Sequence, residues 1–344
     1  MQSYRASHLE ELTAGIFEAA GTPADIAAHV AHSLVVSNLM GHDSHGVIRI
    51  PQYLESIAKG AIVPAARPTV VKETATTAVV DGNWAFGQIT AAFGTDVAIE
   101  KARSQGTSAV FLNRLNHIGR LGEYTETAAH EGMFAFMAGG SQSGGPVAPF
   151  GAAGRALGTN PLAFSLPSGP DEALVVDMAT SVAAEGKLRV ARAKGQAVAP
   201  GTIIDKSGNP TTDPNDFYNG GALLTFAGHK GYSLSMIAET IGRYPAGGEK
   251  IEGKDIHFGA FLSVVNLAAF RPVEEFEQAV ASRISEVKKV RLADGFSEIL
   301  MPGEPERRMK AKRQAEGVPL PDDTVDKLTS IAASLNVPMP KPVG

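Results

Sequence analysis

The chain has 344 residues, of which 44% are hydrophobic and 19% charged, and its formal net charge is −5. This composition is ordinary for a globular protein of one or two domains, and the acidic balance makes nucleic acids and anionic membranes poor partners. The chain has no cysteine, which excludes disulfides, thiolate metal sites and cysteine nucleophiles. Because the sequence shows neither a signal peptide nor an apolar run near the ~18 residues of a membrane span, we expect a cytoplasmic protein.

Helix signals dominate both ends of the chain. Apolar residues at helical spacing predict helices up to residue 60, and again at 307–315 and 324–335. Between these ends, strand and helix signals alternate. Strand patterns lie at 69–72, 78–80, 108–112, 133–137, 162–166, 174–177, 202–205 and 261–270, and helical patterns at 93–104, 119–131, 182–194, 232–243 and 274–290. We therefore predict a mostly helical domain from residues 1–75 and 305–344, and a mixed α/β domain from 76–304.

The stretch GHDSHGVIR at 41–49 gathers two imidazoles, a carboxylate, a hydroxyl and a guanidinium between two predicted helices. His45 is a candidate general acid/base because imidazole titrates near neutral pH, and Arg49 offers the planar two-donor fork that suits a carboxylate. Pro51 predicts a tight turn around His45 and a helix that begins just before the proline. In the alternative interpretation, the same residues only end one helix and cap the next.

Three further segments carry polar groups at the ends of predicted elements. His117 follows a strand, where ligand groups gather in α/β proteins, although it could simply satisfy a loop carbonyl. Lys230 stands at the start of a helix whose amides would suit a phosphate, or it is a solvated lysine. Asp177 ends a strand, where it could accept ribose hydroxyls or cap the next helix. The Gly-Thr-Asn-Pro segment at 158–161 indicates an ordinary turn when taken alone.

Several common motifs are absent from the sequence. No G-x-G-x-x-G follows a strand, and there is no Walker A, G-x-S-x-G or H-E-x-x-H pattern. His42 and His45 could ligate a metal, but few other ligand residues lie nearby in the sequence. We therefore favour acid/base chemistry over a metal site and expect no metal.

Taken together, these segments resemble a known family. The set GHDSHGVIRIPQY, NHIGRLGEY, APFG…GTNPLAF, DMATS, GNPTTDP, LLTFAGHKGYSLS and MPGE, in this order, is similar to the malate/L-lactate dehydrogenase family that lacks the Rossmann fold. The resemblance covers nearly the whole chain, and GHDSHG, HIGR, LLTFAGHKGY and GVPLP are most similar to its bacterial hydroxycarboxylate dehydrogenase B branch. Because this family binds NAD(P) on its own α/β fold, the resemblance implies a non-Rossmann cofactor domain framed by the helical one.

The resemblance also implies residue roles. His45, supported by Ser44, would donate a proton to the substrate, and Arg49 would hold the substrate carboxylate. His117 matches a histidine that is the acid/base in some members and part of the cofactor pocket in others. Lys187, counted here with the catalytic set, stands where the imine reductases of the family carry an aspartate, which argues against an imine substrate. The implied cofactor contacts are His117, Thr159, Asp177, Met178, Ala179, Lys230, Pro302, Gly303 and Glu304.

The implied function is hydride transfer between NAD or NADP and a 2-oxo acid/2-hydroxy acid pair by a homodimer. A histidine would supply the proton and Arg49 would orient the substrate. Three alternatives remain open at this point. These are a cyclic imine (piperideine- or pyrroline-2-carboxylate) reductase of the same family, a metal-dependent hydrolase or lyase built on His42 and His45, and a non-catalytic binding protein that retains the fold.

Overall fold

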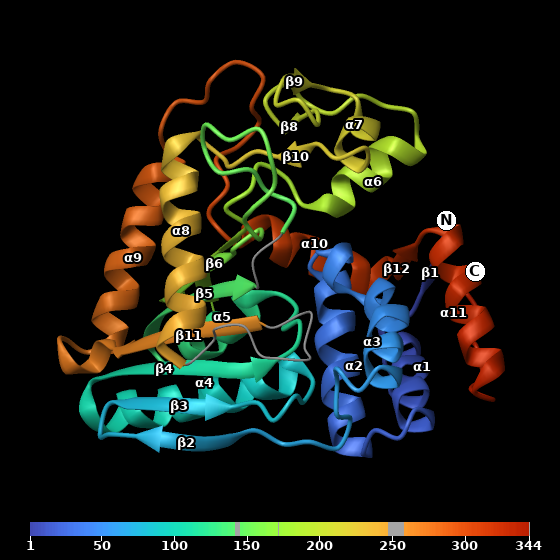
Figure 1. The fold of residues 1–344 in the computed structure, drawn as a ribbon. Helices are drawn as coiled ribbons and strands as arrows, with labels where there is room; N and C mark the ends of the chain where they lie inside the picture. Colours follow the sequence, from blue (N-terminus) through green and yellow to red (C-terminus); the bar gives the residue numbers. More distant parts are fainter. Residues whose placement is uncertain (142–144, 171, 247–257, 344) are drawn as a thin grey trace.

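The centre of the computed structural model, which describes residues 1–141, 145–170, 172–246 and 258–343, is a seven-stranded sheet. Its strand order is β2-β3-β4-β11-β5-β6-β7, with helices on both faces and a layer of helices beside it (Figure 1). Of the neighbouring pairs in this sheet, β3 and β4 run parallel and the others antiparallel. The predicted mixed α/β class, with helices at both ends of the chain, is confirmed.

The strands of the large sheet bury side chains on both faces. They are β2 (Thr69–Glu73), β3 (Thr77–Asp81), β4 (Thr107–Leu115), β5 (Met133–Ser141), β6 (Leu162–Gly169), β7 (Glu172–Met178) and β11 (Phe258–Asn266). Successive residues of a strand point to opposite faces. In β5, Ala135 and Met137 therefore join the core under α4 and α5, whereas Phe136 and Ala138 pack with α8.

Four helices cover this sheet. They are α4 (Gly87–Gln105), α5 (Leu121–His130), α8 (His229–Arg243, followed by the short turn η3, Tyr244–Ala246) and α9 (Val273–Lys288). Helix α8 packs against β5 and β11, and α9 packs against β6. No helix in the described part of the chain is long and apolar enough to cross a membrane.

A separate helical layer is built from both ends of the chain. It contains α1 (Ala6–Ala19), α2 (Ala24–Leu39), α3 (Ile50–Ala58), α10 (Glu304–Glu316) and α11 (Asp322–Ser334). The short strands β1 (Gln2–Tyr4) and β12 (Val318–Leu320) pair antiparallel and tie the two ends together. One buried apolar cluster includes Leu9 and Leu34 from the early helices and Leu328 from α11. The helical layer therefore needs both ends of the chain for its core.

A third, smaller unit lies above the large sheet in Figure 1. It contains α6 (Glu185–Ala193), β8 (Ile203–Ile204), β9 (Pro210–Thr211), α7 (Pro214–Tyr218) and β10 (Ala222–Leu223). Its own apolar core includes Leu188, Phe217 and Leu223. This unit matters for function because α6 reaches the 41–49 loop.

Two predictions from the sequence need comment. The strand predicted over 261–270 is β11, which ends at Asn266, because the Asn266 side chain accepts a hydrogen bond from the Ala268 backbone amide at 3.1 Å and starts the short turn η4 (Leu267–Ala269). Strand β2 pairs with β3, so the sheet begins before residue 75. The domain boundaries that we placed near residues 75 and 304 stay a prediction.

Candidate active site

The 41–49 loop connects α2 to α3 through two short 3₁₀ turns. These are η1 (Asp43–His45) and η2 (Val47–Arg49), and α3 begins at Ile50 with Pro51 in its first turn. The predicted tight turn around His45 and the helix start just before Pro51 are confirmed. A proline fits there because the first helical positions need no N–H donor.

Two residues outside the loop hold it in place. The Asn38 side chain accepts a hydrogen bond from the Val47 amide at 2.9 Å and donates one to Asp43 at 2.7 Å. Arg313 of α10 pairs with both carboxylate oxygens of Asp43, at 2.6 and 3.0 Å, and also donates to the Asn38 carbonyl. The Asn38 side chain fills the space that a Cβ at position 46 would need, so that only glycine fits there without a shift. The loop is therefore fixed from two helices that are far apart in sequence.

Two histidines face each other at this loop. The rings of His45 and His117 stack with centroids 5.4 Å apart and an angle of 16° between their planes. His45 Nδ1 lies 3.0 Å from the Ser44 hydroxyl, as the proposed Ser-His pair requires. His117 Nδ1 lies 2.8 Å from the Tyr53 hydroxyl, and the oxygen of that hydroxyl accepts a hydrogen bond from Gln88 at 2.8 Å. The structure thus brings the two predicted histidines into one site.

Arg49 lies beside this pair of rings. Its Nε donates to the Ser44 carbonyl at 2.6 Å, and its Nη1 donates to the Gln52 side chain at 2.7 Å. These bonds use two of the five N–H groups of a guanidinium. The remaining donors have the fork geometry that binds a carboxylate.

The two imidazoles are neutral at pH 7. Burial lowers the pKa of His45 to about 3, with smaller contributions from the positive charges of Arg49 and nearby groups. Burial, Arg49 and His45 together hold the pKa of His117 well below its usual range. The same positive charge therefore acts on both rings, so that any anion bound to Arg49 would raise both pKa values.

Helix α6 packs against the 41–49 loop. A Cβ on Gly186 would lie 3.3 Å from the Cβ of Ser44, and the charges of Glu185 and Arg189 act on the pKa of Arg49. Lys187 has an exposed side chain on this helix. Because successive helical residues turn by about 100°, Lys187 points to a different side from Gly186. The catalytic role of Lys187 stays a prediction, and Arg189 is a cation of α6 whose charge acts on the pKa of Arg49.

Two of the predicted cofactor residues, Thr159 and Lys230, lie in segments next to a groove, although neither residue lines it. Thr180 donates hydrogen bonds to the Thr159 carbonyl through its amide and its hydroxyl, both at 2.9 Å, and Ser181 bridges to Thr225. Lys230, exposed, is the second residue of α8. Beside them lies a groove of about 550 Å³, whose lining includes Phe150, Val182, Leu224, Thr225, Ala227 and Gly228. Its volume falls within the ~300–1,000 Å³ of small-molecule sites.

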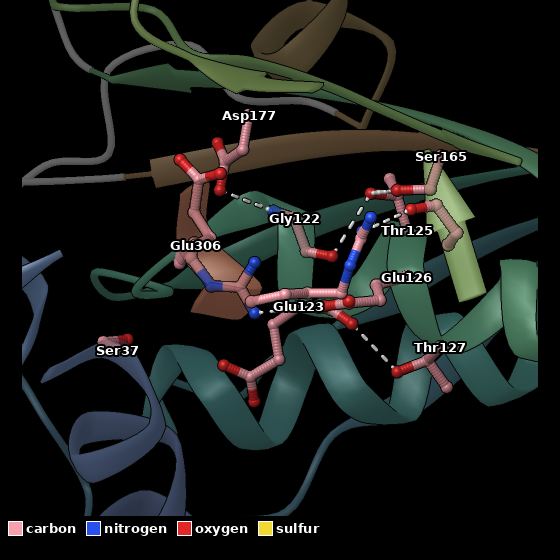
Figure 2. A network of polar contacts seen from close by, with 12 residues as sticks. Ser37, Gly122, Glu123, Thr125, Glu126, Thr127, Ser165, Asp177 and Glu306 are labelled. Carbon is pink, nitrogen blue, oxygen red and sulfur yellow. Dashed lines mark hydrogen bonds and ion pairs between the residues drawn. The ribbon is translucent and has the colours of Figure 1, made fainter. Parts of the chain in front are cut away.

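Asp177 and the Pro302-Gly303-Glu304 segment do not line this groove but lie near the end of β7, where Asp177 and Gly303 border a separate small cavity. The Asp177 carboxylate accepts a hydrogen bond from the Gly122 amide at the start of α5, at 2.8 Å, as Figure 2 shows. Burial raises its pKa, while the charge of Arg120 opposes that shift. The small cavity has a volume of about 20 Å³ and is bounded also by His42 and Glu306.

The other residues near the end of β7 differ in exposure and orientation. Met178 is exposed and Ala179 half-buried. The Pro302 carbonyl accepts from the Val175 amide at 3.3 Å, and a Cβ on Gly303 would lie 3.2 Å from that of Val175. The Glu304 carboxylate binds the Met301 amide and pairs with Lys288 and Arg308 at the surface. Glu304 is therefore engaged with its own helix end, and its cofactor role stays a prediction.

Sequence reasoning missed several members of this site. Asn38 and Arg313 contact the loop, Tyr53 contacts His117, and Gln88 contacts Tyr53. Each of the four looks like an ordinary helix residue in the sequence. The one signal in the sequence that could have indicated Tyr53 and Gln88 is a polar group on a helix face that is otherwise apolar. Among the residues that the structure describes, no three His, Asp or Glu side chains gather as metal ligands.

Comparison with known proteins identifies the family. The family model described as malate/L-lactate dehydrogenase matches residues 4–329. The chain belongs to this family. A malate/(S)-sulfolactate dehydrogenase of Methanothermus fervidus is 36% identical over 94% of this chain and 95% of that protein. Hydroxycarboxylate dehydrogenase B of Escherichia coli O157:H7 is 35% identical over 97% of this chain and 95% of that protein.

A solved structure agrees with this assignment. The malate dehydrogenase of Entamoeba histolytica superposes with a TM-score of 0.94 at 28% identity, covering 99% of both chains. The malate/L-lactate dehydrogenase family consists of NAD(P)-dependent 2-hydroxyacid dehydrogenases, and this member is accordingly an oxidoreductase. The predicted family and enzyme class are confirmed.

Proposed function

We propose that this family member interconverts a 2-oxo acid and its 2-hydroxy acid at the His45–His117 pair, with NAD or NADP as the cofactor. One observation carries the proposal. The guanidinium of Arg49 and the stacked imidazoles of His45 and His117 lie together in one site. A 2-oxo acid needs one group for its carboxylate and another for the oxygen that becomes a hydroxyl. Arg49 and the histidines offer these two kinds of group side by side.

Arg49 has two effects in this proposal. Its free N–H groups bind the substrate carboxylate, and the bound carboxylate neutralises the charge that lowers the pKa of both histidines. During reduction His45 passes a proton to the oxygen at C2, and the bound carboxylate favours the protonated imidazole by removing the part of the pKa shift that Arg49 causes, beside the larger part caused by burial. In the reverse direction, a neutral His45 accepts the hydroxyl proton. Ser44 holds the His45 ring through Nδ1.

In this proposal the cofactor binds in the groove beside α8. Gly228, directly before the start of α8, lines this groove, and the positive end of the helix and the charge of Lys230 would suit a phosphate. Thr159, Asp177, Met178 and Ala179 would hold the rest of the cofactor, with Pro302 and Gly303 at its other edge. When bound, the nicotinamide supplies or accepts the hydride.

We also propose that the enzyme is a homodimer. Family likeness supports this, as does the helical layer formed from both ends of one chain, which can present a self-complementary surface. Leu234, Met236 and Ile237 on α8 are also solvent-exposed in the single chain, at 40%, 40% and 61%. Sedimentation velocity at micromolar concentration should give a mass near twice 35.9 kDa. A monomer would contradict the proposal.

A substrate screen tests the activity. NADH and NADPH oxidation would be followed with pyruvate, oxaloacetate, phenylpyruvate, sulfopyruvate and a cyclic imine, each with and without a chelator. We expect turnover of at least one 2-oxo acid that the chelator leaves unchanged. Turnover of the imine alone would replace the proposal with an imine reductase. Such a result would also mean that the enzyme reduces imines although Lys187 stands where the imine reductases carry an aspartate. Chelator-sensitive hydrolysis without NAD(P)H oxidation would replace it with a metal enzyme on His42 and His45.

A further inference from the structure

A buried chain of hydrogen bonds leads from α4 through α3 to His117. Tyr53 is 2% exposed and Gln88 0% exposed. The Gln88 amide nitrogen lies 2.8 Å from the Tyr53 hydroxyl, which in turn lies 2.8 Å from His117 Nδ1. The Tyr53 ring is fixed between Phe17 and Phe86, with centroids 6.2 and 6.0 Å away. Neither Tyr53 nor Gln88 has a part in the chemistry proposed above.

Counting hydrogens along this chain fixes the state of His117. A tyrosine hydroxyl has one hydrogen to donate, and the Gln88 amide already donates to its oxygen. Within the described residues, the acceptor left for the Tyr53 hydrogen is His117 Nδ1. Burial raises the pKa of Tyr53 to about 12, so that the hydrogen stays on its oxygen at neutral pH. A neutral imidazole that accepts at Nδ1 carries its own hydrogen on Nε2.

The opposite arrangement is less favourable. Turning the Gln88 amide around would let its oxygen accept from Tyr53, and Tyr53 would then accept from His117 Nδ1–H. That change would leave the Gln88 NH₂ group at the buried position where its oxygen now has no hydrogen-bond partner among the described residues. An orphaned buried N–H is rarer in proteins than an under-satisfied carbonyl oxygen. The direction from Gln88 to Tyr53 to His117 is therefore preferred.

We propose that Tyr53 and Gln88 are positioning residues that hold neutral His117 with its hydrogen on Nε2, so that Nε2–H is the group offered to the substrate oxygen. This rests on the proposed 2-oxo acid chemistry. A neutral imidazole donor polarises a carbonyl without giving up its proton. The two stacked histidines then have separate roles, because His117 donates a fixed hydrogen bond while His45 exchanges the proton.

The tautomer can be measured without turnover. Histidine labelled with ¹⁵N, and the His117 signals assigned with a His117→Gln variant, would show which ring nitrogen carries the hydrogen. We expect Nε2–H in the wild-type enzyme, and a shift of the Nδ1 resonance in Tyr53→Phe, which loses the donor but keeps the ring. Tyr4→Phe is the matched control, because its buried hydroxyl binds only Gln2, at 2.7 Å, among the described residues. The wild-type spectrum is decisive even if Tyr53→Phe does not fold.

Kinetics test the link to the reaction. For a 2-oxo acid that the wild-type enzyme reduces, Tyr53→Phe should lower kcat about tenfold and leave KM within about twofold. A wild-type Nδ1–H tautomer, an unmoved Nδ1 resonance in Tyr53→Phe, or an unchanged kcat in that variant would each overturn the inference. Failure of the wild-type enzyme to reduce any 2-oxo acid would count against the proposed function instead, and the spectrum would still report the tautomer.

Discussion

Gly46→Ala is the most direct test of how the 41–49 loop is held. A Cβ at this position would lie 2.1 Å from Asn38 Oδ1 and 2.3 Å from its Cγ, far inside the 3.0 Å limit of real Cβ contacts. Gly46 has φ −90° and ψ −154°, an extended conformation open to alanine, so the cost comes from the collision. Asn38 must move, and the buried Val47 amide then loses its acceptor.

The magnitude follows from the bonds that break. Leaving a buried amide unsatisfied costs about 1–3 kcal/mol, and losing the Asn38–Asp43 bond costs about 1 kcal/mol more. We therefore expect Gly46→Ala to lower the free energy of unfolding by about 2–4 kcal/mol in urea titrations. Because Ser44 and His45 lie on the displaced loop, kcat should fall as well.

Two further variants make this result interpretable. Asn38→Ala removes the colliding side chain, so in that background Gly46→Ala should cost less than about 0.5 kcal/mol. Gly154→Ala is the matched control, because a Cβ there meets no heavy atom within 4 Å, and its effect should stay within about 0.5 kcal/mol. If Gly46→Ala is as stable as the wild type, or if its cost simply adds to that of Asn38→Ala, the reasoning is refuted.

The remaining predictions concern pH, kinetics and cofactor binding. The folded pKa of His45, about 3, lies below its unfolded value of ~6.5, so its contribution to stability is complete above pH ~6.5 and decreases toward pH 3 by at most about 1.4 kcal/mol per pH unit. His45→Gln should flatten that slope in denaturation measured at several pH values, and an unchanged slope would contradict the burial argument. His45→Ala should lower kcat by ~10²–10⁴-fold, whereas Arg49→Lys should mainly raise KM for the 2-oxo acid; the reverse pattern would exchange their roles. Lys230→Ala should weaken NAD(P)H binding in calorimetry, with Lys327→Ala on α11 as the control, and equal dissociation constants would remove Lys230 from the cofactor site.

The local part of the site could be predicted from the sequence because its signals are local. Pro51 fixes the helix start, and the residue types of His45 and Arg49 indicate their chemistry within five positions of each other. The supports could not be predicted in this way. Arg313 reaches Asp43 across 270 residues, and Gln88 reaches Tyr53 across 35. The periodicity of a helix in the sequence does not predict which distant element its polar residues will contact in the fold.

The same limit applies to the fold. Strand patterns in the sequence predicted all seven strands of the large sheet. Their order depends on long-range pairing, since β11 inserts between β4 and β5. Strands β1 and β12 have three residues each, too few to show a period of two, and their pairing depends on the tertiary structure.

The pairing of β1 with β12 has a consequence for how the protein is made. The reactive loop lies within the first fifty residues, but the strand and the arginine that complete its support follow some 270 residues later. A chain emerging from the ribosome at ~5–20 residues per second would hold His45 and Arg49 in an unfinished helical layer for at least ten seconds. Until residues 313–320 emerge, apolar faces of α1 and α2 lack part of their cover. Folding on the ribosome is thus expected to finish the sheet first and the reaction centre last.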